Sequence, residues 1–244
     1  VSGVAHEINN PANFISLNTP LLLRLWHGVL PTLDAHAAAH SDFAVGTMAW
    51  SEVRALVPQC HDGIQEGVRR IKRIVTDLKD FAREDTPGFA DTVDLNAVVA
   101  TAVRLVEHTV RKWTHTLRLE LGDGLPALSG SHQRLEQVVI NLLINACHAL
   151  PRHDCAIRVR TRYDTAALAV VLEVEDEGIG IPTEVLQRIT EPFFTTKRDI
   201  GGTGLGLSVS AAIIAEHGGT MTFVSQVGSG TTARITLPVE RQPG

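Results

Sequence analysis

The chain has 244 residues, 44% of them hydrophobic, and a formal net charge of −5 at pH 7. This length suits one large domain or two ordinary ones, with enough apolar residues for a buried core. The acidic balance gives no sign of a nucleic-acid-binding surface. Neither a signal-peptide pattern nor an apolar run of the roughly 18–20 residues that cross a bilayer is found. We therefore expect a cytoplasmic protein.

Cysteine usage also indicates a cytoplasmic protein, and histidine usage gives no sign of a metal site. Cys60, Cys147 and Cys155 are odd in number and form no CxxC motif, which predicts reduced thiols. The 11 histidines show no metal-ligand spacing such as HExxH, so most are expected on the surface or in packing. The chain starts without methionine, inside a helical pattern, and we expect it to be a piece of a longer protein with an upstream sensor region.

The first 85 or so residues have helical periodicity. A heptad-like apolar seam recurs every seven residues, and a second seam follows after an irregular or partly helical connection at 31–51. The first seam comprises Ile8, Ile15, Leu22 and Val29, and the second comprises Ile64, Val68, Ile71, Val75, Leu78 and Ala82. A polar face that also repeats every seven residues carries His6, Asn13, Pro20 and His27, so His6 is expected to point away from the seam.

Two such helices form a hairpin that has too little partner surface to bury both seams. The simplest solution is a four-helix bundle made by two copies of the chain. The alternative is a hairpin that packs on the second half of its own chain.

Pro87 and Gly88 mark a boundary, beyond which the period changes. Strands are expected at 156–163 and 167–176, with two more in "GTMTFVSQ" and "GTTARITLPV", and helices at about 95–112, 131–150 and 205–217. This order predicts a mixed sheet covered by helices on one face, an α/β sandwich of about 155 residues.

Three motifs of this second half have chemical meaning. On the helix "QVVINLLINACHAL", Asn141 and Asn145 lie four apart and share a face. An asparagine pair also occurs as a cap or bridge, and both roles stay open here, but a carboxamide oxygen is a neutral, hard ligand suited to Mg²⁺. In "DEGIGIP", Asp176 ends a buried strand, where its carboxylate can accept a bond from an exocyclic amine.

The third motif is "GGTGLGLSVS" at 201–210, where a glycine loop leads into a helix. Backbone N–H groups of such a loop and the positive end of a helix bind phosphate. It matches neither the Walker loop nor the Rossmann turn. Between the glycine motifs, "EPFFTTK" has the composition of a flap anchored by Phe193 or Phe194, with Lys197 able to meet a phosphate.

With these motifs in this order, the chain resembles the sensor histidine kinases of two-component signalling over essentially all its length. Residues 1–86 resemble their dimerisation and histidine-phosphotransfer domain. Residues 87–244 resemble their catalytic ATP-binding domain, which has the Bergerat (GHKL) fold shared by gyrase, the Hsp90 chaperones and MutL. One departure is that His148 and Ala149 stand where many members carry a basic residue and tyrosine.

The resemblance implies that His6 is the phosphorylated histidine and that Glu7 is its neighbouring base. Neutral imidazole, with a pKa near 6.5, has a nitrogen able to attack phosphorus. Asn10 would orient a water that dephosphorylates the partner protein. Pro11 cannot donate a hydrogen bond to the Glu7 carbonyl, so the helix should bend just past His6.

For the nucleotide site, the resemblance implies ATP and Mg²⁺ as cofactors. Asn145 would hold Mg²⁺, Asn141 would support the nucleotide one turn earlier, and Asp176 would read the adenine amine. The remaining expected nucleotide contacts are Gly178, Gly180, Lys197, Gly202, Thr203, Gly204, Leu205 and Gly206.

The implied function is ATP-dependent autophosphorylation on His6, followed by transfer to an aspartate of a response-regulator receiver domain by a homodimer that also acts as its phosphatase. One alternative is a slow ATPase of the gyrase or chaperone kind. Those enzymes use a glutamate on the asparagine helix to activate water, whereas this chain has Asn141 there. Another alternative is a dimeric scaffold that binds nucleotide without turnover.

Overall fold

The computed structural model describes residues 2–40, 42–81, 92–196 and 203–239, and for residues 2–6 and 77–81 it describes the backbone alone. The chain divides into two compact units, Val1–Arg83 and Glu84–Gly244, each described here by itself. The expected boundary between residues 86 and 87 lies outside the described residues. Within them, no helix is both long and apolar enough for a membrane span.

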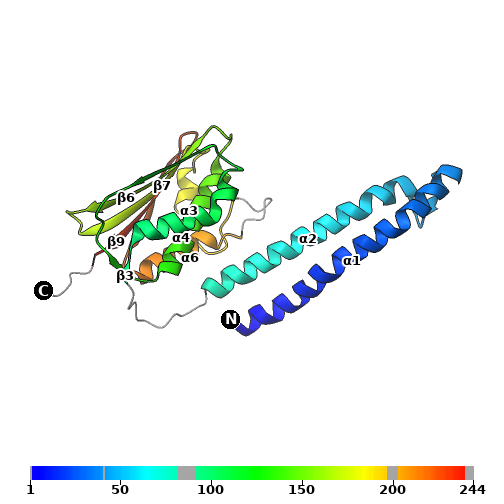
Figure 1. The fold of residues 1–244 in the computed structure, drawn as a ribbon, viewed down its shortest axis with the longest axis horizontal. Coiled ribbons are helices and arrows are strands. Elements are labelled where there is room, and N and C mark those ends of the chain that lie inside the picture. Colours follow the sequence, from blue (N-terminus) through cyan, green and yellow to red (C-terminus); the bar gives the residue numbers. More distant parts are fainter. Residues whose placement is uncertain (1, 41, 82–91, 197–202, 240–244) are drawn as a thin grey trace. The chain divides into compact units, whose positions relative to one another are not determined.

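The first unit is a hairpin of two long helices, α1 (Ser2–His40) and α2 (Trp50–Phe81) (Figure 1). α1 runs uninterrupted through Pro11, Pro20 and Pro31. The expected irregular or partly helical connection at 31–51 is therefore partly helical, since residues 31–40 continue α1 and α2 begins at Trp50. The alanine-rich stretch 35–40 continues the helix, since alanine has the highest helix propensity.

The connection itself is a two-stranded ribbon of β1 (Ala44–Val45) and β2 (Met48–Ala49), which turns at Gly46 with φ +66°. Asp34 joins the two helices at this end, because its carboxylate accepts hydrogen bonds from Trp50 Nε1 at 3.1 Å and Arg54 Nε at 2.9 Å. The hairpin tip is thus closed by side chains of both helices.

Only one apolar stripe of the hairpin is buried. Ala12, Val68 and Val75 are at most 3% exposed. The first predicted seam remains exposed to between 37% and 64%, at Ile8, Ile15, Leu22 and Val29. The second seam divides, since Val68 and Val75 face inward whereas Ile64 and Ile71 are 47% and 40% exposed. The hairpin alone therefore leaves a long apolar surface uncovered.

The second unit contains a five-stranded sheet in the order β4-β6-β7-β9-β8. Its strands are β4 (Thr116–Leu121), β6 (Ala156–Asp164), β7 (Ala169–Asp176), β8 (Thr220–Gln226) and β9 (Gly230–Pro238). The β4–β6 pair is parallel and the other pairs are antiparallel. A short pair, β3 (Thr92–Val93) with β5 (Leu128–Ser129), lies outside this sheet.

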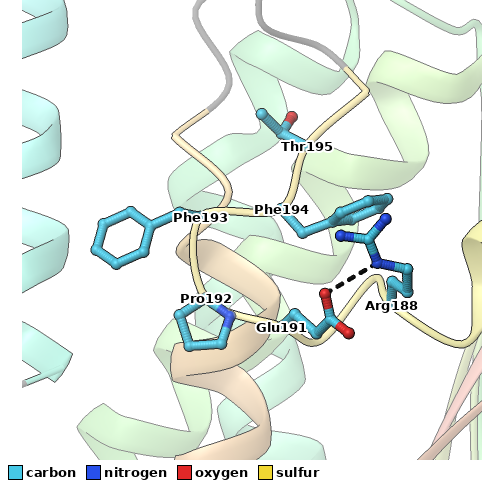
Figure 2. Close-up of a pocket in the computed structure, with 6 residues that line it drawn as sticks. All are labelled: Arg188, Glu191, Pro192, Phe193, Phe194 and Thr195. Atoms are coloured by element: carbon cyan, nitrogen blue, oxygen red, sulfur yellow. Dashed lines mark hydrogen bonds and ion pairs between the residues drawn. The ribbon is translucent and has the colours of Figure 1, made fainter.

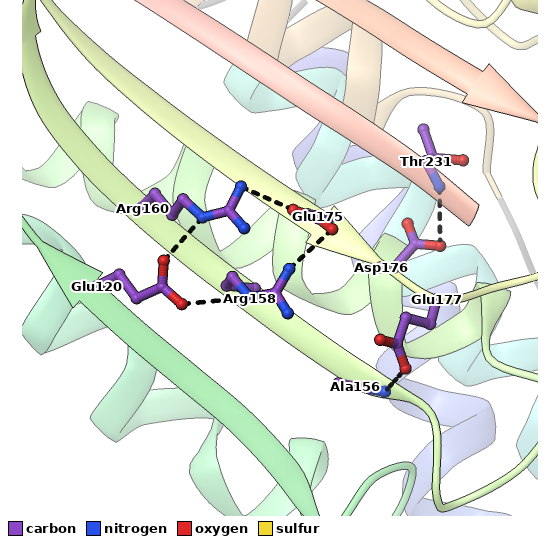
Figure 3. Close-up of polar contacts among 8 residues, drawn as sticks. All are labelled: Glu120, Ala156, Arg158, Arg160, Glu175, Asp176, Glu177 and Thr231. Atoms are coloured by element: carbon purple, nitrogen blue, oxygen red, sulfur yellow. Dashed lines mark hydrogen bonds and ion pairs between the residues drawn. The ribbon is translucent and has the colours of Figure 1, made fainter. Parts of the chain in front are cut away.

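Three helices cover one face of the sheet, α3 (Leu95–Val110), α4 (His132–Ala149) and α6 (Gly206–Glu216), while α5 (Thr183–Leu186) is a single turn (Figure 1). Alternation along β6 shows the two faces: Ile157 and Val159 are fully buried under the helices, whereas Arg158 and Arg160 stay half-buried on the other face. There the two arginines form ion pairs with Glu120 and Glu175 (Figure 3).

The predicted fold class, a helical region followed by an α/β sandwich with helices on one face, is confirmed. The four predicted strands and three predicted helices of the second unit are all present. The sequence reading missed β4 and the β3–β5 pair.

Candidate functional site

The asparagine helix α4 begins at Ser131, whose side chain caps the helix by accepting from the Arg134 N–H at 3.4 Å. Its apolar face enters the core at Leu142, Leu143 and Ala146, which are at most 3% exposed. Asn141 and Asn145, one turn apart, are half-buried and flank this apolar face. The core side thus fixes the helix, and the asparagines lie at the edge of that core.

Asn141 faces the start of α6. Its Nδ2 lies 3.3 Å from the backbone oxygen of Gly206 and 3.3 Å from Ser210 Oγ. Ser210 Oγ in turn donates to the same Gly206 oxygen at 2.9 Å. The two motifs, 65 residues apart in sequence, therefore meet where the first N–H groups of α6 have no acceptor inside their own helix. Such a helix start is suited to phosphate.

In the glycine loop, position 204 must be glycine because the Phe193 backbone packs closely against it. This residue has φ +72°, and a Cβ there would lie 2.5 Å from the carbonyl carbon of Phe193. The Phe193 N–H donates to the Gly204 oxygen at 3.0 Å, and the Leu205 N–H donates to Thr203 Oγ1 at 3.3 Å. Gly206 is different, because a Cβ would meet Asn141 only at an ordinary contact distance of 3.8 Å. Backbone packing therefore requires Gly204 but leaves space for a methyl group at Gly206.

The carboxylate of Asp176 is fixed at the end of β7 and is 7% exposed. Its Oδ1 accepts from the N–H group of Gly178 at 2.9 Å. The same oxygen accepts from the N–H group of Thr231 at 3.3 Å (Figure 3). A Cβ at Gly178 would lie 2.5 Å from that oxygen and 2.7 Å from the Ala149 backbone oxygen. Glycine at 178 therefore lets the turn close over Asp176 and against the end of α4.

Gly180 ties the same turn to the β8–β9 hairpin. It has φ +69°, and a Cβ would lie 2.1 Å from the backbone oxygen of Gln226. The Gly228 N–H donates to the Ile179 oxygen at 2.8 Å. The turn that begins at Asp176 is therefore held from two sides, by α4 and by the last hairpin.

Three contributors to this site were not found by sequence reasoning. Thr231 donates its backbone N–H to the Asp176 carboxylate, and Ser210 Oγ accepts from the Asn141 side chain. Gly230 has φ +102°, and a Cβ there would lie 1.9 Å from the backbone oxygen of Asp176. The "GSGTT" sequence indicates a turn at Gly230. Its contact with Asp176 could not be predicted, because that contact depends on the β7–β9 register, which pairs Asp176 with Thr231.

The "EPFF" segment forms a pocket of about 350 Å³ (Figure 2). Its wall is built by Arg188, which stacks its guanidinium 4.5 Å from the Phe194 ring centre and pairs with Glu191 at 3.0 Å. Phe193 adopts φ +66° and is 58% exposed. Asn141, Asn145 and Asp176 are not among its lining residues, whereas the Phe193 backbone lies against Gly204 of the glycine loop.

The predicted phosphoacceptor stretch lies on α1. Glu7 and Asn10 are exposed, as a site shared by two proteins requires. His6 is placed in the helix, and its side chain lies outside what the structure describes. Lys197 and Gly202 also lie outside the described residues.

Two further observations concern the chemistry of the site. Across the described residues, no group of three or more His, Cys, Asp or Glu side chains is placed to hold a metal ion. Cys147, behind the asparagine face, is fully buried, and burial raises the pKa of its thiol to about 11, so the group is neutral at physiological pH. All three cysteines are free thiols, as predicted.

Comparison with known proteins gives the family. Residues 130–241 match the model of the histidine kinase-, DNA gyrase B- and HSP90-like ATPases. The solved catalytic domain of the histidine kinase ThkA is 30% identical, with a TM-score of 0.54, and the alignment covers 61% of this chain and 94% of that domain. The chain belongs to the sensor histidine kinases.

Two curated sensor kinases align with nearly the whole chain. Sensor kinase CckA of Brucella abortus is 34% identical over 249 residues, and sensor histidine kinase ZraS of Escherichia coli K12 is 31% identical over 238 residues. The alignments cover 97% and 98% of this chain but only 23% and 44% of those kinases. This sensor histidine kinase chain thus spans less than half the length of either relative.

Proposed function

We propose that this chain is the phosphoryl-transfer core of a sensor histidine kinase: it binds Mg·ATP, phosphorylates His6 and passes the phosphoryl group to an aspartate of a response-regulator receiver domain. The observation that carries the proposal is the meeting of Asn141 on α4 with the start of α6 at Gly206. That contact brings a carboxamide helix and a phosphate-binding helix start to one place. Asp176 and its glycine turn supply the third part of the site.

The residues present fit adenine at one end. The backbone N–H groups of Gly178 and Thr231 donate to Oδ1 of Asp176 and orient its carboxylate. A carboxylate held in this way accepts from the exocyclic amine of adenine and repels the carbonyl oxygen of guanine. Gly178 and Gly180 leave no side-chain bulk beside it, which suits a flat base.

The residues also fit Mg²⁺ with triphosphate at the other end. Magnesium keeps several waters and binds through one or two protein oxygens plus the substrate's phosphates. A single carboxamide, that of Asn145, therefore suffices, and the lack of an acidic cluster among the described residues is consistent with this donor set. Mg²⁺ when bound would offset phosphate charge, while the loop from Thr203 to Gly206 holds the phosphates through backbone N–H groups.

The chemical step assigns a role to each residue of the opening stretch. One ring nitrogen of neutral His6 attacks the γ-phosphorus, the bond from that phosphorus to the bridging oxygen breaks, and ADP leaves. The proton of the other ring nitrogen passes to Glu7. In a second reaction, Asn10 orients a water toward the phosphoaspartate of the partner, and this hydrolysis is the phosphatase activity of the chain.

The uncovered seam of α1 supports a homodimer. Monomeric soluble proteins rarely expose a contiguous apolar surface of this kind, and a second copy buries it in a four-helix bundle. Leu22 and Val29 of the seam are 64% and 48% exposed, and Phe14 and Leu25 beside it are 68% and 60% exposed.

A slow ATPase of the clamp kind is disfavoured by the contacts of Asn141. A carboxamide cannot take a proton from water, and its Nδ2 is directed to Gly206 and Ser210. The three functions are separated by incubating the chain with γ-labelled ATP. Acid-labile, base-stable label on the protein supports the kinase, released phosphate without label supports the ATPase, and neither product supports a scaffold.

Two variants sharpen this experiment. His6→Gln should abolish the label and leave ATP affinity nearly unchanged. Asn145→Ala should keep the fold but lower labelling by several powers of ten, because metal and geometry supply most of phosphoryl-transfer catalysis. Acid-labile label on His6→Gln would show that another histidine is the acceptor, and near-normal labelling of Asn145→Ala would remove that residue from the metal site.

A further inference from the structure

A histidine links the C-terminal end of α6 to the start of α4. His217 follows the last residue of α6, and its ring Nδ1 lies 2.7 Å from the Ile213 backbone oxygen. On the other side of the ring, Nε2 accepts the backbone N–H of Ser131, the N-cap residue of α4, at 3.0 Å. The imidazole therefore bridges two helices through backbone groups of both.

These two bonds specify one protonation state. Nδ1 faces a carbonyl oxygen and must carry a proton, whereas Nε2 faces an N–H donor and must not. Only the neutral imidazole satisfies both. A second proton on Nε2 would point at the Ser131 N–H and break that contact.

The surroundings hold the ring in this position. A Cβ at Gly130 would lie 2.4 Å from His217 Cδ2, so glycine at that position permits the close approach. The charged groups next to the ring are Glu216 on its own helix and Arg134 on α4, and these two form an ion pair. His132, at the first position of α4, lies farther out and is paired with Glu136 at 3.8 Å.

Burial lowers the pKa of His217 below its usual value of 6.5, and Arg134 acts in the same direction. The Ile213 carbonyl and Glu216 act in the opposite direction but more weakly than burial. The ring is therefore neutral at pH 7 and gains its second proton only in more acidic solution.

α6 is thus attached to α4 near both of its ends. Asn141 holds its first residue, Gly206, and His217 holds its last turn. The eleven residues between these attachments span roughly 16 Å of rigid helix. With both ends attached, the direction of α6 is fixed, and so is the position of its N–H groups relative to Asn141 and Asn145.

We propose that His217, as the neutral imidazole, is a positioning residue for nucleotide binding: it fixes α6 on α4 so that the phosphate-binding start of α6 faces the asparagines, and its protonation weakens ATP binding. This inference rests on the proposed function. It adds that the nucleotide site loses affinity in acid through a residue at the far end of the helix from the phosphates.

The test measures the Kd of a non-hydrolysable ATP analogue with Mg²⁺ on the full chain between pH 5 and pH 8. Titration of the ligand is the same for every variant, so the ratio of each variant's Kd to the wild-type Kd isolates His217. His217→Gln keeps an acceptor oxygen within reach of the Ser131 N–H and does not titrate. His217→Leu removes the acceptor, and His132→Gln is the matched control that removes a neighbouring exposed histidine.

At pH 8 we expect the leucine variant to bind about fivefold more weakly than wild type, which is the scale of one lost hydrogen bond, and the glutamine variant to bind within about twofold. As the pH falls below 6.5, the wild type should weaken relative to His217→Gln, while His132→Gln follows the wild type. Gly130→Ala, which displaces the ring without changing its chemistry, should weaken binding at pH 8 as the leucine variant does.

Identical pH profiles for wild type and His217→Gln would overturn this inference alone. The same holds if His217→Leu melts at a lower temperature but binds with the wild-type Kd, since His217 would then be only structural. If the leucine variant does not fold, the comparison of wild type with His217→Gln decides. Absence of nucleotide binding by the wild type at pH 8 would overturn the proposed function together with the inference.

Discussion

At the scale of single residues, the site is defined by backbone contacts that leave no room for a side chain. Gly178 and Gly180 surround Asp176, and each has backbone atoms within 3 Å of the position that a Cβ would take. Gly204 has the same relation to Phe193. The glycines therefore do more than permit unusual φ angles, because they let separate segments touch.

Gly180 and Gly228 separate these two effects. Both have positive φ, +69° and +79°, but a Cβ at Gly228 meets nothing within 4 Å. Gly228→Ala should destabilise the chain by about 1–2 kcal/mol from φ alone. Gly180→Ala should cost about 1–3 kcal/mol more because of the Gln226 clash, and it should weaken ATP binding. Urea unfolding of both variants checks this, and equal midpoints would contradict it.

Asn10 allows the kinase and phosphatase roles to be separated. Asn10→Ala should keep His6 labelling and slow the decay of the phosphorylated partner, because it removes only the group that we propose to orient water. Alanine is the better helix former by several tenths of a kcal/mol, so the helix should not suffer. Asn18→Ala, an exposed asparagine on the same helix, is the control for that gain.

Both rates are measured on one preparation of the Asn10 variant. If labelling and dephosphorylation change together, Asn10 acts instead through the bend expected at Pro11. A variant that labels poorly but dephosphorylates normally would contradict both explanations.

At the scale of elements, α1 and α4 use opposite solutions for their apolar residues. α4 buries its apolar face within its own unit, with Leu143 and Cys147 fully inaccessible. α1 buries only a narrow stripe against α2 and leaves its heptad seam exposed. The first arrangement positions the proposed site within one chain, and the second underlies the proposed dimer.

Leu22→Glu tests the use of that seam. Leu22 is 64% exposed in the single chain, so a charge there should leave the hairpin intact, whereas in a bundle it would be buried without a partner. We expect the dimer Kd to rise at least about a hundredfold in sedimentation experiments, with ATP affinity unchanged. Leu105→Glu, on an equally exposed leucine of α3, should leave the dimer intact. Dimers of unchanged strength in the Leu22 variant would exclude this seam as the interface.

At the scale of the whole molecule, the proposed nucleotide site and the proposed phosphoacceptor His6 belong to separate units. The core cluster of buried residues around the sheet runs from Val93 to Leu237, and among the described residues none of the helical hairpin belongs to it. The α/β unit therefore has a core of its own, as an independently folding domain requires.

The isolated fragment 84–244 should consequently bind ATP with a Kd within about twofold of the full chain and should take no label, since His6 is absent. Adding fragment 1–83 should restore labelling on that fragment alone, with a lower rate because the two no longer share a chain. Calorimetry and labelling on the two fragments check these expectations. Loss of ATP binding by 84–244 would show that the hairpin contributes to the nucleotide site.

The sequence by itself determined the order and type of most elements and the fold class, because apolar periodicity is local and changes from heptad to alternating near residue 90. It did not reveal β4, whose "TLRLEL" is made largely of good helix formers and becomes a strand by pairing in parallel with β6, 40 residues away. The extent of helix in the connection at 31–51 stayed open for a related reason, since "AHAAAH" has no apolar period to extend.

Only the tertiary structure decided which groups meet. The contact of Asn141 with Gly206 joins residues 65 apart, that of Asp176 with Thr231 joins residues 55 apart, and that of His217 with Ser131 joins residues 86 apart. Sequence motifs identified Asn141 and Asp176 as candidate site residues but not the residues that they contact. No motif pointed to the contact of His217 with Ser131. Hydrogen bonds between distant backbone and side-chain groups depend on strand register and helix packing, and these follow from the burial of the whole core rather than from any short stretch of the chain.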